Sequence, residues 1–174
     1  MAFSVLPHWT GGSIFDIDPA ALAGRGITLL LADLDNTLVP YGVPEPTEAV
    51  RAWNRALEEA GVTLFVLSNN RHPQRPERFA HALGVPFLGH AGKPKPDGFR
   101  RAMEQMGCTP EQTAIVGDQL FTDVWGAKRA GMHTILVKPI HPKEEIQIVL
   151  KRYLEKIVLH FYKKSKKRLK KVAN

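Results

Sequence analysis

The chain has 174 residues, a length that fits one domain with a sizeable core. Hydrophobic residues make up 44% and charged residues 24%, as in an ordinary globular protein. The single cysteine, Cys108, excludes a disulfide within the chain and favours a reducing compartment. We therefore expect a cytoplasmic protein, since the sequence shows neither a signal peptide nor an apolar run of about 18 residues.

The net charge of +7 is concentrated at the C-terminal end of the chain. Residues 1–150 carry 14 Lys and Arg against 16 Asp and Glu, a balance of −2. Residues 151–174 carry 10 Lys and Arg against one acidic residue, a balance of +9. Because the two parts differ this sharply in charge, we expect a mildly acidic domain over residues 1–142 and a basic amphipathic tail over residues 143–174.

Strands and helices are expected to alternate along the domain. Apolar runs bounded by turn residues predict buried strands, and stretches that end at glycine predict helices. In chain order the elements are strand 27–33, helix 46–60, strand 62–67, helix 74–83, strand 85–88, helix 97–106, strand 113–116, helix 121–130 and strand 133–137. This alternation predicts an α/β fold, a Rossmann-like doubly wound parallel sheet of about five strands.

Polar side chains follow three of these strands at their carboxyl ends: Asp33, Ser68 and Asp118. Open parallel sheets bind ligands in the crevice outside these strand ends, so we expect the three side chains to converge there. Lys93 lies in the segment Gly92–Pro96, a loop because two prolines exclude a regular helix. Taken alone, Ser68 could instead cap the following helix.

The pair Asp33 and Asp35 indicates a metal site. The two acids alternate with Leu34, so an extended backbone would point both carboxylates to the same side. Two close carboxylates repel and need a cation or a shared proton. Hard oxygen ligands beside a phosphate favour Mg²⁺, and Asp118 can add a third carboxylate.

Together these residues suit phosphoryl transfer. Asp33 can act as nucleophile through an aspartyl-phosphate. Asp35 can protonate the leaving oxygen and later deprotonate the attacking water. Lys93 and the Ser68 hydroxyl can bind the transferring oxygens. The sequence therefore predicts a Mg²⁺-dependent phosphomonoester hydrolase.

The order of these motifs resembles that of the haloacid dehalogenase-type phosphatases. The segments that carry the resemblance are Asp33-Leu34-Asp35-Asn36-Thr37, Ser68 after an apolar strand, Lys93-Pro94, and Gly117-Asp118 with Asp123. The resemblance implies that Asp33 is nucleophile and metal ligand. It implies that Asp35 is the acid/base and a metal ligand through its backbone carbonyl. Ser68 and Lys93 would bind phosphate, and Asp118 would hold Mg²⁺.

Five further residues are expected to support the site. By the same resemblance, Asn69 touches phosphate, Asn36 and Thr37 belong to the loop of the acid/base, and Asp123 is the second acid of the last motif. Asp123 could instead be only an acid favoured at a helix start by the helix dipole. Gly117 is expected to let the chain turn tightly beside the metal.

The match narrows to a subgroup. The superfamily more often has Asp-Gly-Thr where this chain has Asp35-Asn36-Thr37. This segment, together with Ser13–Ile17 and Ser68-Asn69-Asn70, resembles the YqeG-like subgroup. That subgroup is similar to mitochondrial phosphatidylglycerophosphate phosphatases. The intervals between motifs are too short for a cap domain. An open site suits a large or membrane-bound phosphate ester, so a phospholipid is the expected substrate class. The alternative is a soluble or protein phosphoester.

The tail is expected to form a helix with a basic end. Apolar side chains recur at helical spacing over residues 144–162, and residues 163–171 are almost all Lys or Arg. Three interpretations compete: docking on the same sheet or on a twin subunit, contact with an anionic membrane surface, or contact with RNA or the ribosome. The tail lacks an aromatic, Gly-rich platform, which makes nucleic acid the weaker partner.

Overall fold

The computed structural model describes residues 5–70 and 74–141. These residues belong to the compact unit Met1–His141. The basic tail, with its expected helix over residues 143–174, lies outside the described residues. Within the described ranges, no helix is both long enough and apolar enough to cross a membrane.

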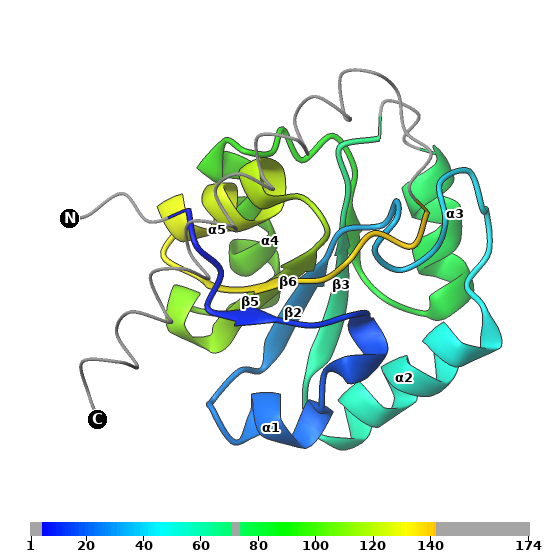
Figure 1. Cartoon of the computed structure of the whole chain (residues 1–174), viewed down its shortest axis with the longest axis horizontal. Coiled ribbons are helices and arrows are strands. Elements are labelled where there is room, and N and C mark those ends of the chain that lie inside the picture. Colours follow the sequence, from blue (N-terminus) through cyan, green and yellow to red (C-terminus); the bar gives the residue numbers. More distant parts are fainter. Residues whose placement is uncertain (1–4, 71–73, 142–174) are drawn as a thin grey trace, which may run out of the picture. The chain divides into compact units, whose positions relative to one another are not determined.

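The unit is built on a six-stranded parallel sheet with helices on both faces (Figure 1). The strands are β1 Trp9–Thr10, β2 Leu29–Ala32, β3 Thr63–Leu67, β4 Phe87–Leu88, β5 Thr113–Gly117 and β6 His133–Leu136. The α-helices are α1 Pro19–Ala23, α2 Glu48–Glu59, α3 Gln74–Leu83, α4 Pro96–Met106 and α5 Trp125–Arg129. Two 3-10 turns, Ile14–Asp16 and Pro110–Gln112, and one π-helical turn, Leu120–Val124, complete the list.

The predicted α/β fold with a parallel sheet is confirmed, and all five predicted strands are present. The sixth strand, β1, was not expected. It contains only two residues, which pair with Ile135 and Leu136 of β6, so it is too short to produce a periodic pattern in the sequence. The stretch predicted as one helix over 121–130 is divided into the π-helical turn and α5.

The strand order places β2 at the centre of the sheet. The order is β1-β6-β5-β2-β3-β4, so the chain moves outward from β2 through β3 to β4 and then returns to β5 on the other side. Ala32 at the end of β2 pairs with both Val66 of β3 and Val116 of β5, so the three strands end at the same level. The order reverses between β2 and β5, and such a reversal is where open α/β sheets bind ligands.

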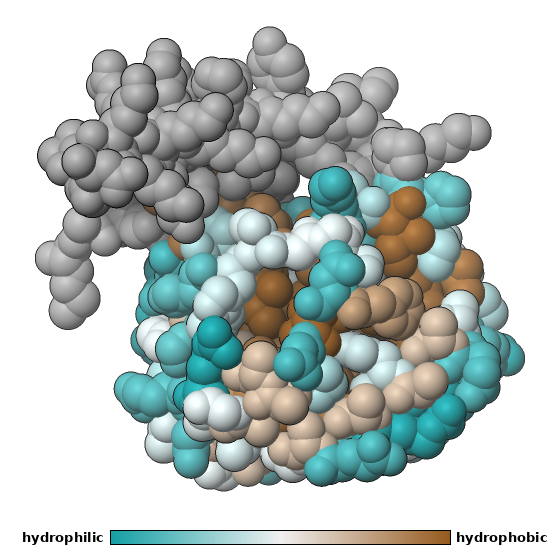
Figure 2. Space-filling model, turned by 60° about the horizontal axis from the view of Figure 1, so that its bottom comes forward, coloured by the Kyte–Doolittle hydropathy of each residue, from teal (hydrophilic) through white to brown (hydrophobic). Residues whose placement is uncertain are grey.

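Two apolar clusters fill the spaces on either side of the sheet. Successive side chains of β2 point to opposite faces, with Leu30 and Ala32 in one cluster and Leu29 and Leu31 in the other. The first cluster also contains residues of α1, α2 and α3, and the second contains residues of α4 and α5. In Figure 1, α1 and α2 lie below the strands, with α4 and α5 above. The face turned forward in Figure 2 exposes small hydrophobic patches among hydrophilic residues.

The carboxyl edge of the sheet carries no inserted domain in the described chain. Between β2 and β3 the only named element is α2, which Thr47 caps by accepting a hydrogen bond from the Val50 amide at 3.2 Å. Gly61, at a φ of 78°, follows the end of α2 in the left-handed conformation that the sequence pattern predicted. Between β3 and Lys93 the named elements are α3 and β4. The edge where β2, β3 and β5 end is therefore left uncovered by any described domain.

Gly98 lets α4 approach the loop that contains Lys93. A Cβ atom added at Gly98 would clash with the carbonyl oxygen of Ala91 and lie 2.8 Å from its carbonyl carbon. Ala91 itself donates its amide to the Ser68 carbonyl oxygen at 3.0 Å. The close approach of α4 to Ala91 therefore helps to place the segment between β4 and Lys93.

We expect Gly98→Ala to lower the free energy of unfolding by about 1–3 kcal/mol, because overpacking against backbone atoms outweighs the gain of roughly 0.5–1 kcal/mol in helix propensity. Chemical denaturation measures the change. Gly24→Ala is the control, since its added Cβ would lie 3.3 Å from the Ala20 carbonyl oxygen without clashing. A Gly98→Ala variant as stable as the parent would contradict this account of the packing.

Candidate active site

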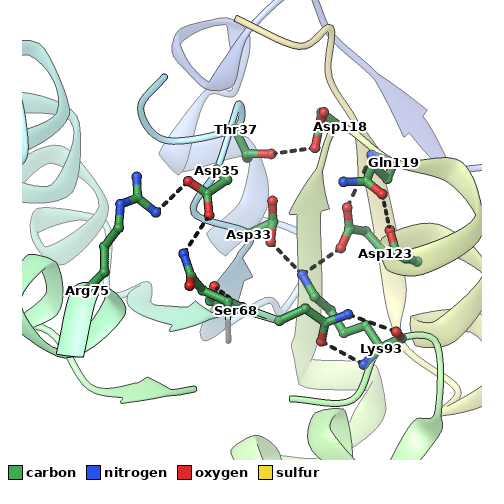
Figure 3. Close-up of polar contacts among 12 residues, drawn as sticks. Asp33, Asp35, Thr37, Ser68, Arg75, Lys93, Asp118, Gln119 and Asp123 are labelled. Carbon is green, nitrogen blue, oxygen red and sulfur yellow. Dashed lines mark hydrogen bonds and ion pairs between the residues drawn. The ribbon is translucent and has the colours of Figure 1, made fainter. Parts of the chain in front are cut away.

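The predicted site residues converge at the carboxyl edge of the sheet (Figure 3). Asp33, Ser68 and Asp118 directly follow β2, β3 and β5, and Lys93 reaches them from the loop before α4. Asp123 comes from the π-helical turn after β5. All five side chains are buried, so their charges interact in an environment largely shielded from water.

Lys93 joins two of the acids. Its Nζ atom donates to Asp33 Oδ1 at 2.6 Å and to Asp123 Oδ1 at 2.7 Å, and its side chain is 2% exposed. Burial on its own would lower the pKa of Lys93, but the charges of Asp123 and Asp33 and their hydrogen bonds hold that pKa above its usual value. Lys93 therefore remains a cation in the buried site.

The Asp33 carboxyl is a weaker acid than usual. Burial raises the pKa of Asp33 to about 6, and the nearby charges of Asp123 and Asp35 act in the same direction. The Lys93 ammonium and its hydrogen bond oppose this shift without cancelling it. A further cation beside Asp33 would therefore stabilise its charged form.

Three buried carboxylates form a candidate cation site. Asp33, Asp118 and Asp123 each offer an oxygen, and these oxygens all lie within 4.8 Å of one another. Lys93 supplies one positive charge to the group, which leaves an excess of negative charge. Hard oxygen donors with excess negative charge suit Mg²⁺, so the residues present fit the predicted ion.

The Asp35 carboxylate turns away from this cluster, contrary to the expectation that both acids would face one ion. Its Oδ1 atom forms an ion pair with Nη1 of Arg75, and its Oδ2 atom accepts a hydrogen bond from Asn70 Nδ2 at 3.3 Å. Figure 3 shows Asp35 between Arg75 and Asp33. The two alternating acids therefore face different cations, which reduces their mutual repulsion, because the backbone is no longer extended after Asp33.

The loop of Asp35 is held by Asn36 and Thr37. Asn36 has a φ of 62°, its amide donates to the Val39 carbonyl oxygen at 2.8 Å, and its own carbonyl oxygen accepts from the Ile140 amide at 3.0 Å. Thr37 Oγ1 donates to Asp118 Oδ1 at 3.2 Å. The structure thus gives both residues contacts that orient the loop and one of the acids.

Asn69 contacts the backbone of Lys93. Its Nδ2 atom donates to the Lys93 carbonyl oxygen at 2.8 Å, and its Oδ1 atom accepts from the Lys93 amide at 2.9 Å. Ser68, which precedes it, is buried, and its Oγ atom accepts from the Asn70 amide at 3.0 Å. The polar residues after β3 therefore help to order two loops, the one that contains Lys93 and the one that contains Asp35.

Asp123 packs directly against Gly117. Asp123 Oδ2 accepts from the Gln119 amide at 3.1 Å, while Oδ1 faces Lys93. A Cβ atom added at Gly117 would lie 2.6 Å from the Asp123 Cβ atom. Gly117 lies in β5 without a positive φ, so the tight turn expected there is wrong: glycine is needed because Asp123 packs against it.

Sequence analysis missed two residues that contact Asp35, the predicted acid/base. Arg75 and Asn70 both touch the Asp35 carboxylate. Their signal was present, because both follow β3 within eight residues of its end, on the edge where the acids gather. A search for cations beside that edge would have found Arg75, whereas only the folded loop shows which acid it faces.

In metal-free protein, we expect the free energy of unfolding to fall as the pH rises from about 4 to about 6. Unfolded Asp33 releases its proton near the usual pKa of 3.8, whereas the folded carboxyl retains it to about 6. Within this window the folded state binds more protons, so rising pH favours unfolding. Chemical denaturation with a chelator measures the slope.

The slope assigned to Asp33 is isolated by comparison with variants. Asp33→Asn should remove part of the decline, and Asp97→Asn, which changes an exposed acid of α4, should not. Identical slopes for the parent and Asp33→Asn would show that the buried carboxyl does not titrate in this window.

Comparisons with known proteins agree with this geometry. Residues 90–145 match the HAD-hydrolase-like family. The chain is 36% identical over 159 residues to the probable phosphatase YqeG of Bacillus subtilis (strain 168), covering 91% of this chain and 92% of that protein. It is 32% identical over 159 residues to the chloroplastic phosphatidylglycerophosphate phosphatase 1 of Chlamydomonas reinhardtii, covering 86% of this chain but only 59% of that enzyme.

A solved structure shares the fold. The putative 3-deoxy-D-manno-octulosonate 8-phosphate phosphatase from Vibrio cholerae aligns with a TM-score of 0.50 and 21% identity, over 74% of this chain and 73% of that chain. The nearly full-length match to YqeG confirms the predicted subgroup. The chain therefore belongs to the HAD-like hydrolases and, within them, to the phosphatase family that includes YqeG.

Proposed function

We propose that the chain hydrolyses phosphomonoesters through an aspartyl-phosphate on Asp33, with Mg²⁺ as cofactor. The observation that carries the proposal is the position of Asp33, at the end of the central strand, bonded to Lys93 and grouped with Asp118. A carboxylate beside a fixed cation suits attack on phosphorus, because the transferring oxygens carry negative charge that needs a partner.

Lys93 and Ser68 are proposed to bind the transferring phosphoryl group. Lys93 already lies 2.6 Å from Asp33, so its ammonium can contact an oxygen of a phosphoryl group on that carboxylate. Asn69 supports this role through its paired hydrogen bonds to the Lys93 backbone, and we infer that it acts mainly by positioning Lys93. Asp123 holds the same ammonium from the other side.

Asp33, Asp118 and the Asp35 backbone carbonyl are proposed to hold the metal. When bound, the ion supplies neutralisation of the transferring oxygens. Both oxygens of Asp123 face other partners, Lys93 and the Gln119 amide, which favours an anchoring role for this acid. The protonated Asp35 carboxyl is proposed to give its proton to the leaving oxygen, and the resulting carboxylate then accepts a proton from the attacking water.

Asp33→Asn should lower hydrolysis of an aryl phosphate by about 10³-fold or more, because an amide cannot form the acyl phosphate. The measurement is the steady-state release of phosphate with Mg²⁺ and with a chelator. Asp97→Asn, an exposed acid on α4, is the matched control and should retain the parent activity. Comparable rates for the parent and Asp33→Asn would rule out Asp33 as nucleophile.

We further propose that the substrate is a phospholipid head-group phosphate such as phosphatidylglycerophosphate. The similarity to the Chlamydomonas enzyme of that name supports it, as does the absence of an inserted domain over the carboxyl edge in the described chain. Two large apolar side chains beside the site loop are exposed, Tyr41 at 71% and Ile140 at 43%. They could contact the apolar part of a lipid, while the basic tail favours an anionic membrane surface.

We expect faster turnover of phosphatidylglycerophosphate in anionic vesicles than of soluble phosphate esters. Activity of the full chain on vesicles should fall with added salt. Deleting residues 163–174 should reduce activity on vesicles and should leave activity on an aryl phosphate unchanged. Equal turnover of lipid and soluble esters by the full chain would favour the alternative substrates, soluble or protein phosphoesters. A tail that binds RNA at low salt, without effect on lipid turnover, would favour the nucleic-acid partner.

A further inference from the structure

Arg75 lies where α3 meets the loop that follows Asp35. Its Nη1 atom pairs with Asp35 Oδ1, and its Nη2 atom donates to the Val43 carbonyl oxygen at 3.0 Å. Its guanidinium carbon is 5.9 Å from the centre of the Tyr41 ring. Three contacts with the stretch of residues 35–43 thus hold the guanidinium beside Asp35, the proposed acid/base.

The two cations of the site differ in access. The Lys93 side chain is 2% exposed and is enclosed by Asp33 and Asp123, whereas the Arg75 side chain is 16% exposed. Lys93 can therefore meet only the group that reacts at Asp33. The Arg75 side chain lies nearer the solvent, beside the exposed ring of Tyr41.

Arg75 also has donors that the described protein does not use fully. A guanidinium carries five N–H donors, and Nε of Arg75 is a buried atom with no hydrogen-bond acceptor among the described residues. Because Nε is enclosed, a substrate reaches it only when the Arg75 side chain moves outward. A planar fork of this kind matches the oxygens of a phosphate group. Arg75 therefore has the chemistry of an anion site as well as that of a partner for Asp35.

The position of Asp35 tells which part of the substrate Arg75 would meet. In the proposed function, Asp35 protonates the leaving oxygen, so the leaving group lies on the Asp35 side of the reacting phosphorus. Arg75 contacts Asp35 on that side. A second anion on the leaving group meets the carboxylate that Asp35 becomes once it has given its proton, so a cation is needed on this side, and Arg75 provides one.

We propose that Arg75 binds a phosphodiester carried by the leaving group of the substrate, and so selects phosphomonoesters that have this second anionic group. The inference rests on the proposed function, because it uses the direction in which the leaving group departs. It makes Arg75 a specificity-determining residue, distinct from Lys93, which binds the phosphoryl group that is transferred.

The test compares two soluble substrates that both carry the reacting phosphomonoester on a glycerol unit. Glycerophosphoglycerol phosphate contains the phosphodiester, and glycerol phosphate lacks it, so membrane binding plays no part. The parent should prefer the first in kcat/KM by about 10- to 100-fold, as expected for a charge-assisted contact. Arg75→Ala should reduce this preference to about one, chiefly by raising KM for the diester substrate.

Two further variants separate specificity from structure. Arg78→Ala removes an arginine of α3 that bonds Glu45 and is 68% exposed, and it should keep the parent preference. Arg75→Lys should retain part of the preference, since the charge remains while the planar fork of donors is lost. If a thermal unfolding assay shows that Arg75→Ala does not fold, Arg75→Lys takes its place in the comparison. Inhibition by glycerophosphoglycerol, which has no phosphomonoester, should weaken in both Arg75 variants.

The outcomes are distinct. A loss in kcat by the same factor on both substrates would overturn the inference, because Arg75 would then act only through Asp35. A parent that hydrolyses glycerol phosphate without preferring the diester substrate would also overturn it, while the proposed function would stand. A parent that hydrolyses neither ester would overturn the inference, and a parent that also leaves an aryl phosphate intact would overturn the proposed function.

Discussion

The ion pairs of Lys93 with Asp33 and Asp123 are the interaction on which the site depends. Three charged groups are buried together, and removing Lys93 would leave the carboxylates uncompensated at a cost of about 3–5 kcal/mol. The surrounding structure serves this arrangement. Asn69 holds the backbone of Lys93, the π-helical turn brings Asp123 back toward β5, and Gly117 leaves room for it.

The site has two sides with different properties. Around Lys93 it is closed, and the buried ammonium pairs with Asp33 and Asp123 within a carboxylate cluster suited to a cation. Around Arg75 it is more open and bordered by an exposed aromatic ring. A phosphoryl group needs the first environment, because transfer depends on neutralised oxygens and little water. A large leaving group needs the second.

Much of the fold and of the site was predictable, because buried parallel strands give continuous apolar runs and their carboxyl ends collect polar residues. Asp33, Lys93 and Asp118 were placed together on this basis. The two-residue strand β1 and the π-helical turn have no periodic signal of their own. Arg75 could have been noted beside this edge, but its pairing with Asp35 could not be predicted, because the direction of the Asp35 side chain follows from the loop conformation at Asn36, with a φ of 62°.

The short loop after β2 has a kinetic consequence. Asp35 and Val39 form an isolated bridge, and Asn36 bonds both Val39 and Ile140, so Asp35, the proposed acid/base, lies on a closed turn of the same segment as Asp33, the proposed nucleophile. The two groups therefore keep their mutual geometry without the arrival of a second domain. An enzyme built in this way need not wait for closure before each chemical step, and its turnover is set by encounter with substrate, by chemistry or by product departure.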